Sequence, residues 1–272
     1  MGQVGQVAGR VVYRKRGELK VRFLGTGTSQ GIPVIGCNCP VCMSADHKDK
    51  RLRTSALLSW GDWRVNIDAG PDFRQQMLRA GVEKLDGVLM THEHNDHMAG
   101  MDDIRPFYFR RGKDFPFYAT AHVQSEIRHR FAYFFHEKPY PGVPRIHFYE
   151  LEPFEDFYIG DKRFTCIPID HGSLDVMGFL VEDFCYITDA KYIHEPSMER
   201  LRGVKTLVLN ALRHRSHASH LSLGEAIALG EALDVERLFL THISHELGLH
   251  EHEQGQLPDW VNLAYDGLVI DV

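Results

Sequence analysis

The stretch MTHEHNDHMAG, residues 90–100, follows a short apolar run and decides how this chain is interpreted. It contains the pattern HxHxDH, whose side chains are His92, His94, Asp96 and His97. Two histidines two positions apart on a loop that leaves a strand can turn toward one ion. The adjacent aspartate and histidine can face a second ion close by. Three imidazoles and a carboxylate suit Zn²⁺, Mn²⁺ or Fe²⁺ and do not suit Ca²⁺, so the stretch predicts a metal site.

Three further candidate ligands stand at the ends of later apolar runs. They are His171 in IPIDHG, Asp189 in CYITDA and His242 in LFLTHI. Together with HxHxDH they form a set of seven, which we divide between two ions. The expected ligands of the first ion are His92, His94 and His171. The expected ligands of the second ion are Asp96, His97 and His242, with Asp189 bridging the two.

Two such ions, about 3.5–4 Å apart, can clamp a phosphoryl group and generate a bridging hydroxide. Asp96 is therefore a candidate catalytic residue as well as a ligand. Asp68 ends the run VNIDAG and is a further carboxylate at a strand end. We expect Asp68 to lie outside the ligand set and to orient a ligand histidine by a hydrogen bond.

Composition and charge narrow the class of protein. The chain has 272 residues, is 43% hydrophobic and carries a net charge of −6. Its longest apolar runs are far shorter than the roughly 20 residues that span a membrane, and no signal-peptide core is recognisable. Five cysteines, three of them clustered, do not form a secreted disulfide pattern, so a cytoplasmic location is expected. The negative charge argues against a nucleic-acid partner.

The pattern of apolar runs predicts one domain over residues 20–272, after a loosely ordered leader over residues 1–19. The expected strands are 20–25, 55–60, 64–68, 87–90, 163–169, 178–183, 184–190, 206–212 and 237–243. The expected helices are 71–81, with Phe73, Met77 and Leu78 on one face, 121–135, and 222–234 with a Ser222–Glu225 capping box. Strands dominate each half. This arrangement favours an α/β protein built as an αββα sandwich, with two mixed β-sheets flanked by helices.

From about Lys20 to its C-terminus the chain resembles the metallo-β-lactamase superfamily. The order HxHxDH, His, Asp, His is highly specific for that fold. The stretches LGTGTSQGIP (24–33), MDDIRPF (101–107) and LTHISHE (240–246), with the cysteine cluster, resemble the phosphoribosyl cyclic phosphate phosphodiesterase branch of the carbon–phosphorus lyase pathway. The resemblance implies an αββα fold, a binuclear Mn²⁺ or Zn²⁺ site and phosphodiester hydrolysis.

The resemblance also offers a role for the cluster CNCPVC, residues 37–42. In that branch a Cys-x-Cys-x-x-Cys loop binds a structural zinc together with a histidine three residues after the last ligand histidine. The corresponding set here is Cys37, Cys39, Cys42 and His245. The alternatives are an unliganded reduced cluster and a redox role, but the strand-to-helix turn of redox Cys-x-x-Cys sites is missing. Cys166 and Cys185 are expected to be small buried hydrophobes.

The resemblance implies a catalytic role for His220, in HASHLSLGEA, because the equivalent position in that branch supplies a catalytic histidine. We expect His220 to protonate the leaving alkoxide. The sequence alone leaves competitors, which are His194, His214 and His217. Asp103 and Arg105 are weaker candidates for substrate contact. The stretch GTGTSQG lacks the spacing of a P-loop and is expected to form a tight turn beside the metal site.

The leading prediction is a binuclear metal-dependent hydrolase of the phosphoric diester class, acting on a small or cyclic phosphodiester through a metal-bridging hydroxide. Its cofactors would be two divalent ions, Mn²⁺ or Zn²⁺, and one structural Zn²⁺. One alternative is a tRNA 3′-end processing endonuclease, although no long basic arm is evident. Another is a glyoxalase II-like thioester hydrolase, which would share the seven ligands but not the Cys₃His set. By analogy with the branch, a homodimer is expected.

Overall fold

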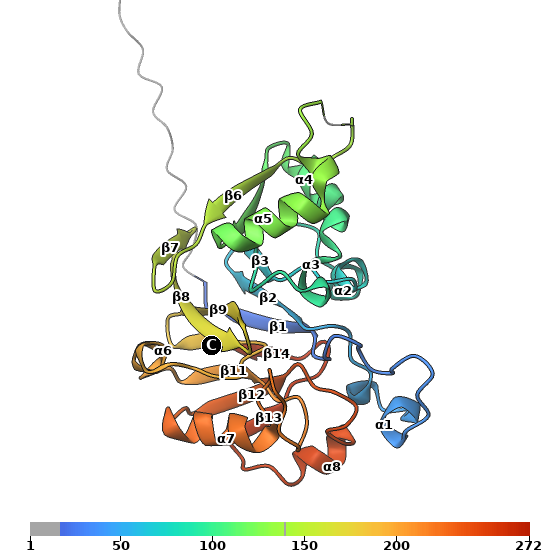
Figure 1. The fold of residues 1–272 in the computed structure, drawn as a ribbon, viewed down its shortest axis with the longest axis vertical. Coiled ribbons are helices and arrows are strands. Elements are labelled where there is room, and N and C mark those ends of the chain that lie inside the picture. Colours follow the sequence, from blue (N-terminus) through green and yellow to red (C-terminus); the bar gives the residue numbers. More distant parts are fainter. Residues whose placement is uncertain (1–16, 139) are drawn as a thin grey trace, which may run out of the picture.

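The computed structural model describes residues 17–138 and 140–272, which form two seven-stranded β-sheets packed face to face (Figure 1). Helices cover the outer face of each sheet (Figure 1). The αββα sandwich predicted from the sequence, an α/β fold with two mixed sheets, is confirmed. Residues 1–16 of the predicted leader lie outside the described residues, and Leu19 is fully buried.

The first sheet is mixed, antiparallel at one side and parallel at the other. Its strands, in spatial order, are β14 (Val269–Asp271), β1 (Lys20–Gly25), β2 (Ser55–Trp60), β3 (Trp63–Ile67), β4 (Gly87–Leu89), β5 (Phe115–Ala119) and β6 (Ile146–Glu150). Neighbours from β14 to β3 are antiparallel, and neighbours from β3 to β6 are parallel.

The second sheet repeats this division. Its strands, in spatial order, are β13 (Val261–Leu263), β12 (Arg237–Thr241), β11 (Thr206–Asn210), β10 (Phe184–Tyr186), β9 (Leu174–Val181), β8 (Lys162–His171) and β7 (Asp156–Ile159). Neighbours from β7 to β10 are antiparallel, and neighbours from β10 to β13 are parallel. In each parallel part the carboxyl ends of the strands meet at one edge, where polar loop residues can gather.

The helices divide between the two outer faces. Those that follow strands of the first sheet are α2 (Phe73–Ala80), α3 (Asn95–Met98), α4 (Arg105–Arg111) and α5 (Ala121–Arg130), with the 3₁₀ turns η2 (Met101–Ile104) and η3 (Ala132–Phe134). Those of the second half are α6 (Glu195–Leu201), α7 (Leu223–Ala232) and α8 (His250–Gln254). The loop from β1 to β2 carries α1 (Pro40–Met43) and η1 (His47–Asp49), away from the sheets (Figure 1).

Local signals account for some helix boundaries and fail at others. The capping box predicted at the start of α7 is present, since the side chains of Ser222 and Glu225 each accept a hydrogen bond from the other's backbone N–H. In α2 the predicted face is wrong at Leu78, which is 65% exposed, because the buried side of the helix consists of Phe73, Gln76 and Met77. The single helix predicted over 121–135 ends at Arg130, and η3 follows it. Among the described residues, no helix is both long and apolar enough to cross a membrane.

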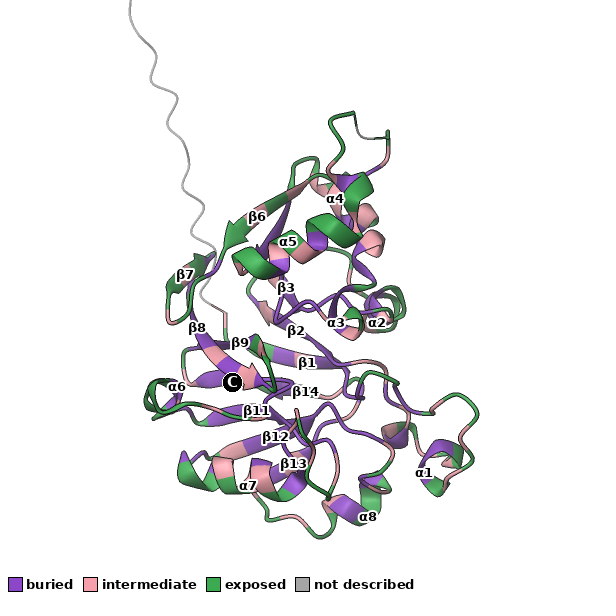
Figure 2. Ribbon diagram, viewed as in Figure 1, coloured by how far each residue is buried: buried purple, intermediate pink, exposed green. Residues whose placement is uncertain are grey.

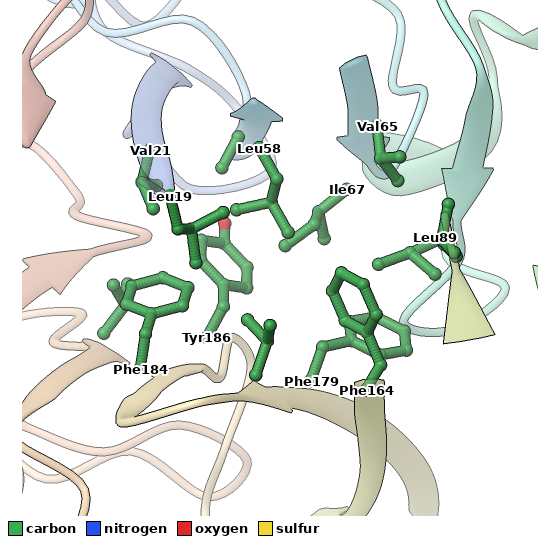
Figure 3. Packing of buried hydrophobic residues seen from close by; sticks show 14 of the residues in the cluster. Leu19, Val21, Leu58, Val65, Ile67, Leu89, Phe164, Phe179, Phe184 and Tyr186 are labelled. Carbon is green, nitrogen blue, oxygen red and sulfur yellow. The ribbon is translucent and has the colours of Figure 1, made fainter. Parts of the chain in front are cut away.

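The main core lies between the two sheets. Aromatic side chains of the second sheet, among them Phe164, Phe179 and Tyr186, pack against aliphatic ones of the first, such as Leu58 and Ile67 (Figure 3). Separate apolar clusters lie under the helices on each outer face. The strands are therefore largely buried, and exposed residues collect on the outer sides of the helices and on loops (Figure 2). Burial on both faces explains why most strands read as continuous apolar runs rather than as alternating ones.

Candidate active site

Strand ends at one edge of the sandwich bring all seven predicted ligands together. The HxHxDH segment follows β4, and His171 is the last residue of β8. Asp189 follows β10, and His242 follows β12. Both Asp189 and His242 have left-handed backbones, with φ of 57° and 53°. Such values are uncommon outside glycine and are retained where packing demands them, here where the chain turns each side chain into the site.

The first predicted triad is assembled as a group. The ligand atoms of His92, His94 and His171 all lie within 4.8 Å of one another. His92 Nε2 is 3.0 Å from His94 Nδ1. The remote nitrogens are occupied elsewhere: His92 Nδ1 is 2.9 Å from Thr91 Oγ1, and His171 Nδ1 donates to the Ser219 carbonyl at 2.6 Å. A ring that donates from its remote nitrogen presents a lone pair at the other, as a metal ligand must.

The second predicted triad is also assembled. The Oδ2 atom of Asp96 is 3.3 Å from His97 Nε2 and 3.6 Å from His242 Nε2. His97 Nδ1 is 2.7 Å from Asp68 Oδ2, and both residues are fully buried. Asp68 also accepts hydrogen bonds from the backbone N–H and the hydroxyl of Thr91. Asp68 therefore lies outside the two triads and fixes the orientation of the His97 ring.

Asp189 lies between the two triads. Its Oδ2 is 3.2 Å from His97 Nε2, and its Oδ1 is 3.1 Å from His242 Nε2 and 4.0 Å from His171 Nε2. The Thr188 hydroxyl donates to Asp189 Oδ2 at 2.7 Å, which limits rotation of the carboxylate. One buried carboxylate thus faces histidines of both groups.

The electrostatics of the site favour positive charge. Burial alone would raise the pKa of Asp189, but the imidazoles of His242 and His97 hold it well below its ordinary value. The pKa of Asp96 is likewise lowered, against burial, chiefly by His97. The pKa of His97 is raised well above its ordinary value, against burial, because Asp189, Asp96 and Asp68 surround it. Buried carboxylates gathered in this way are stable only with cations beside them.

These residues fit divalent metal ions. Within the described part of the chain, Nε2 of His97 and Nε2 of His242 are buried and lack a hydrogen-bond partner. Leaving such atoms unsatisfied costs about 1–3 kcal/mol each, and both point into the space bounded by Asp96 and Asp189. Imidazole nitrogens with carboxylate oxygens are the donor set of Zn²⁺ and Mn²⁺ sites. The two triads and Asp189 could therefore hold two such ions.

Of the competing histidines, His220 lies closest to the ligands. Its Nδ1 is 3.6 Å from Asp189 Oδ1, and its ring centroid is 4.6 Å from that of His171 and 4.8 Å from that of His242. The His220 ring therefore contacts histidines of both triads. Burial, together with the neighbouring imidazoles of His242 and His171, lowers the pKa of His220 to about 3.

The other candidates are engaged elsewhere. His194 contacts Asp170 at 2.7 Å, and His214 contacts Glu253 at 2.9 Å. The ring of His217 is 5.1 Å from that of His220 and accompanies it in the same loop. Arg105, a weaker candidate for substrate contact, forms a salt bridge to Asp102 and donates to the Gly142 carbonyl.

The cysteine cluster is completed by the predicted histidine. His245 Nδ1 is 3.3 Å from Cys37 Sγ, 3.3 Å from Cys39 Sγ and 3.5 Å from Cys42 Sγ. Zinc bonds of about 2.3 Å to sulfur and 2.0–2.1 Å to nitrogen in a tetrahedron would separate the two atoms by about 3.6 Å. The backbone N–H of Cys42 donates to Cys39 Sγ and lowers the pKa of that thiol to about 6. The four residues could therefore hold a zinc ion in a closed site.

Hydrogen bonds tie the cysteine loop to the C-terminal part of the chain. Buried Arg51 donates to the Ala264 carbonyl and to His250 Nδ1, and the His250 N–H donates to Asp49. The stretch GTGTSQG lies beside the second triad, because Thr28 N–H donates to the Ile243 carbonyl. Two segments far apart in sequence are thus fastened next to His242.

Sequence reasoning missed three polar residues that orient the ligands. Thr91 contacts His92 and Asp68, Thr188 contacts Asp189, and Ser219 contacts His171. A signal for two of them was present. A threonine stands directly before the candidate ligand in each of MTHEH, YITDA and FLTHI, at the end of a buried strand.

Comparison with known proteins agrees with this geometry. The family model described as "Beta-lactamase superfamily domain" matches residues 63–243, a span that runs from β3 to the residue after His242. The chain belongs to the metallo-β-lactamase superfamily. Its seven candidate ligands lie inside the matched span, and membership supports the prediction of a hydrolase.

Individual relatives place the chain within the superfamily. A solved structure called "a New Diphosphatase from the PhnP Family" is 37% identical, superposes with a TM-score of 0.88, and covers 94% of this chain and 97% of its own. This match supports the predicted branch. "Octanoyltransferase" of Porphyromonas gingivalis is 40% identical over 90% of this chain, which spans only 50% of that protein. "Ribonuclease Z" of Methanopyrus kandleri is 24% identical and covers 94% of this chain.

The cysteine cluster generates a prediction about zinc content. Replacing Cys39 by serine removes the ligand whose thiolate is the best stabilised, so the chain should lose one bound zinc per molecule and unfold at a lower temperature. Elemental analysis and thermal unfolding measure both effects. Cys166→Ala is the matched control, because it removes a buried thiol of the main core. Equal zinc content in the two variants would contradict a metal site at the cluster.

The buried Arg51–His250 contact generates a prediction about pH. His250 is 4% exposed, and burial with the nearby Arg51 charge holds its pKa at about 4, below the ordinary 6.5. Because the folded state resists protonation, the stability it contributes is present above pH 6.5 and is lost as pH falls through 4. The loss should reach at most about 3 kcal/mol in the free energy of unfolding. His250→Asn retains an acceptor without titrating, so its urea-unfolding curve should depend less on pH. Parallel pH profiles would contradict the assignment.

Proposed function

We propose that the chain is a binuclear metal-dependent phosphodiesterase. The observation that carries the proposal is the position of Asp189 between the two triads. Each of its carboxylate oxygens lies 3.1–3.2 Å from a histidine nitrogen of the second triad. One of them is also 4.0 Å from His171 Nε2 of the first triad. His92, His94 and His171 would hold one divalent ion, and Asp96, His97 and His242 the other, with Asp189 shared. The imidazoles and carboxylates of this donor set accept both Mn²⁺ and Zn²⁺.

When bound, two such ions supply positive charge for the phosphoryl oxygens and activate a water molecule as the nucleophile. The residues of the chain set where this happens. Asp68 holds the His97 ring, Thr188 holds the Asp189 carboxylate, and Ser219 holds the His171 ring. The reaction adds water across one P–O bond, so a diester yields a monoester and an alcohol.

His220 is the proposed general acid. It lies against Asp189, and its ring contacts His171 of the first triad and His242 of the second. When the P–O bond breaks, the leaving alkoxide needs a proton. The low pKa of His220 keeps its ring neutral in the free site, so His220 would take up a proton together with the anionic substrate and pass it to the alkoxide. A positioned acid of this kind contributes about 10²–10⁴-fold to rate.

The cysteine cluster would serve the same site through a structural zinc. Its histidine, His245, lies three residues after His242 in the segment that closes the second triad. A zinc ion there would fasten the loop after β1 to that segment, in addition to the Arg51 contacts. The proposal therefore assigns the third ion to rigidity and not to the reaction.

A second candidate substrate is a diphosphate. The 37% identical neighbour is called a diphosphatase, and attack at phosphorus is common to both reactions. A phosphate leaving group needs less help from an acid than an alkoxide does, so the two substrates would depend differently on His220. Thioester hydrolysis and RNA processing remain as outcomes of the test.

The proposal predicts selective hydrolysis of diesters. The Mn²⁺-loaded chain should cleave bis(p-nitrophenyl) phosphate faster than p-nitrophenyl phosphate, and should leave a glutathione thioester intact. Asp189→Asn removes the shared charge and should lower kcat by about 100-fold or more, since even outer contacts to ligands are worth 10–100-fold. Release of p-nitrophenolate or free thiol is followed by absorbance.

The matched control is Asp170→Asn, which makes the same chemical change next to His171 on a side chain that contacts His194. It should retain most activity. Thioester cleavage without diester cleavage would replace the proposal by a glyoxalase II-like one. Cleavage of an unprocessed tRNA precursor, but of neither small substrate, would favour the RNA-processing alternative. Full activity in Asp189→Asn would contradict the bridging role.

The role of His220 predicts a dependence on the leaving group. His220→Ala should slow hydrolysis of a cyclic diester, whose leaving group is an alkoxide, by about 10²–10⁴-fold. It should slow release of p-nitrophenolate far less, because that anion leaves without a proton. His217→Ala, in the same loop, is the control. Equal losses for good and poor leaving groups would assign His220 to structure or metal binding instead.

A further inference from the structure

One side of helix α5 carries a stripe of polar side chains that lies against the HxHxDH loop. His122, Glu126 and Arg130 are spaced four residues apart, so they share one side of the helix. Val123 and Ile127, one position further along, are buried in the apolar cluster on the outer face of the first sheet. The buried side anchors the helix, and the polar stripe is left to contact the loop.

A single guanidinium nitrogen of Arg130 contacts three residues of this loop. Its Nη1 donates to the Glu93 carbonyl at 2.6 Å, to Asn95 Oδ1 at 2.9 Å, and lies 3.3 Å from Met98 Sδ. Glu93 stands between the two histidines that the loop gives to the first triad. Asn95 stands directly before Asp96, which belongs to the second triad. A single guanidinium therefore bridges the parts of the loop that serve different triads.

The rest of the stripe supports the same contact. The Glu93 carboxylate is nearly buried, and its Oε1 is 3.2 Å from His122 Nε2. Glu126 Oε2 is 3.3 Å from Arg130 Nη2 and so orients the guanidinium toward the loop. The two ends of α5 thus hold different parts of Glu93. Arg130, at the C-terminal end of the helix, binds the Glu93 backbone, and His122, near the N-terminal end, contacts the Glu93 side chain.

We propose that Arg130 is a positioning residue that sets the spacing of the two triads. The inference rests on the proposed two-ion site. Two ions that act together must lie about 3.5–4 Å apart, and a misplacement of about 1 Å can cost 10²-fold in rate. Among the described residues, Arg130 donates to Glu93, Asn95 and Glu126 and lies near Met98, so none of its polar contacts is to a ligand side chain. It acts through Nη1, which fixes the backbone at Glu93 relative to the side chain of Asn95, while Glu126 holds Nη2; lysine lacks this second nitrogen.

The test measures metal binding rather than activity alone. The full chain, freed of loosely bound ions, is titrated with Mn²⁺, and free Mn²⁺ is followed by its EPR signal. Mn²⁺ avoids thiolate sites, so the cysteine cluster does not interfere. Arg130→Met should weaken Mn²⁺ binding by about 10–100-fold and lower kcat more than it raises KM. Arg130→Lys should show an intermediate loss.

The control is Arg128→Met on the same helix, because Arg128 lies over the rings of Phe135 and Phe148, away from the loop. Thermal unfolding checks that each variant folds. If Arg130→Met binds Mn²⁺ as Arg128→Met does, the positioning role is overturned. Should the methionine variant not fold, unchanged Mn²⁺ affinity in Arg130→Lys overturns it instead. A wild-type chain that binds fewer than two Mn²⁺ would overturn the two-ion proposal itself.

Discussion

The arrangement depends on one buried carboxylate placed among histidines. Asp189 enters the site on a left-handed residue in the turn that follows β10, and its oxygens face His97 and His242. Such a backbone costs of order 1–3 kcal/mol and must be held by its surroundings. Here the surroundings are a parallel strand pair, β10 with β11, and the Thr188 hydroxyl. The strained turn therefore belongs to the site, and the sheet behind it supplies the rigidity.

A second chain of contacts starts at Asp68, on the other sheet. Asp68 is also left-handed, accepts two hydrogen bonds from Thr91 and holds His97. Gly70 lies so close to the loop that a Cβ there would be 2.0 Å from the Asp96 carbonyl. The two sheets thus contribute equivalent devices, a carboxylate on a left-handed residue at a strand end. They meet at His97, which contacts Asp68 on one nitrogen and Asp189 on the other.

The sequence predicted much of this because the signals were local. Runs such as 55–60 and 20–25 became β2 and β1 with the expected limits, since buried strands need continuous apolar residues. The strand predicted over 184–190 ends at Tyr186, because the chain turns toward Asp189 before the apolar run is over. Strands β5, β6, β7, β13 and β14 were missed. All but β5 lie at sheet edges, where polar or exposed residues interrupt the apolar run.

The candidate site also divides into features that short motifs predict and features that only the fold shows. Ligand types and spacing are properties of short motifs, so the seven ligands could be proposed from sequence. The cysteine set with His245 came from the resemblance to a known branch, because the spacing of the cysteines alone left their role open. What no motif encodes is which distant helix supports the loop. Arg130 donates to the backbone carbonyl of Glu93, 37 positions away in the sequence, and to the side-chain amide oxygen of Asn95. Backbone acceptors leave no trace in the identity of the residue that carries them. The supports of a metal loop must therefore be read from the fold, even where the ligands can be read from the chain.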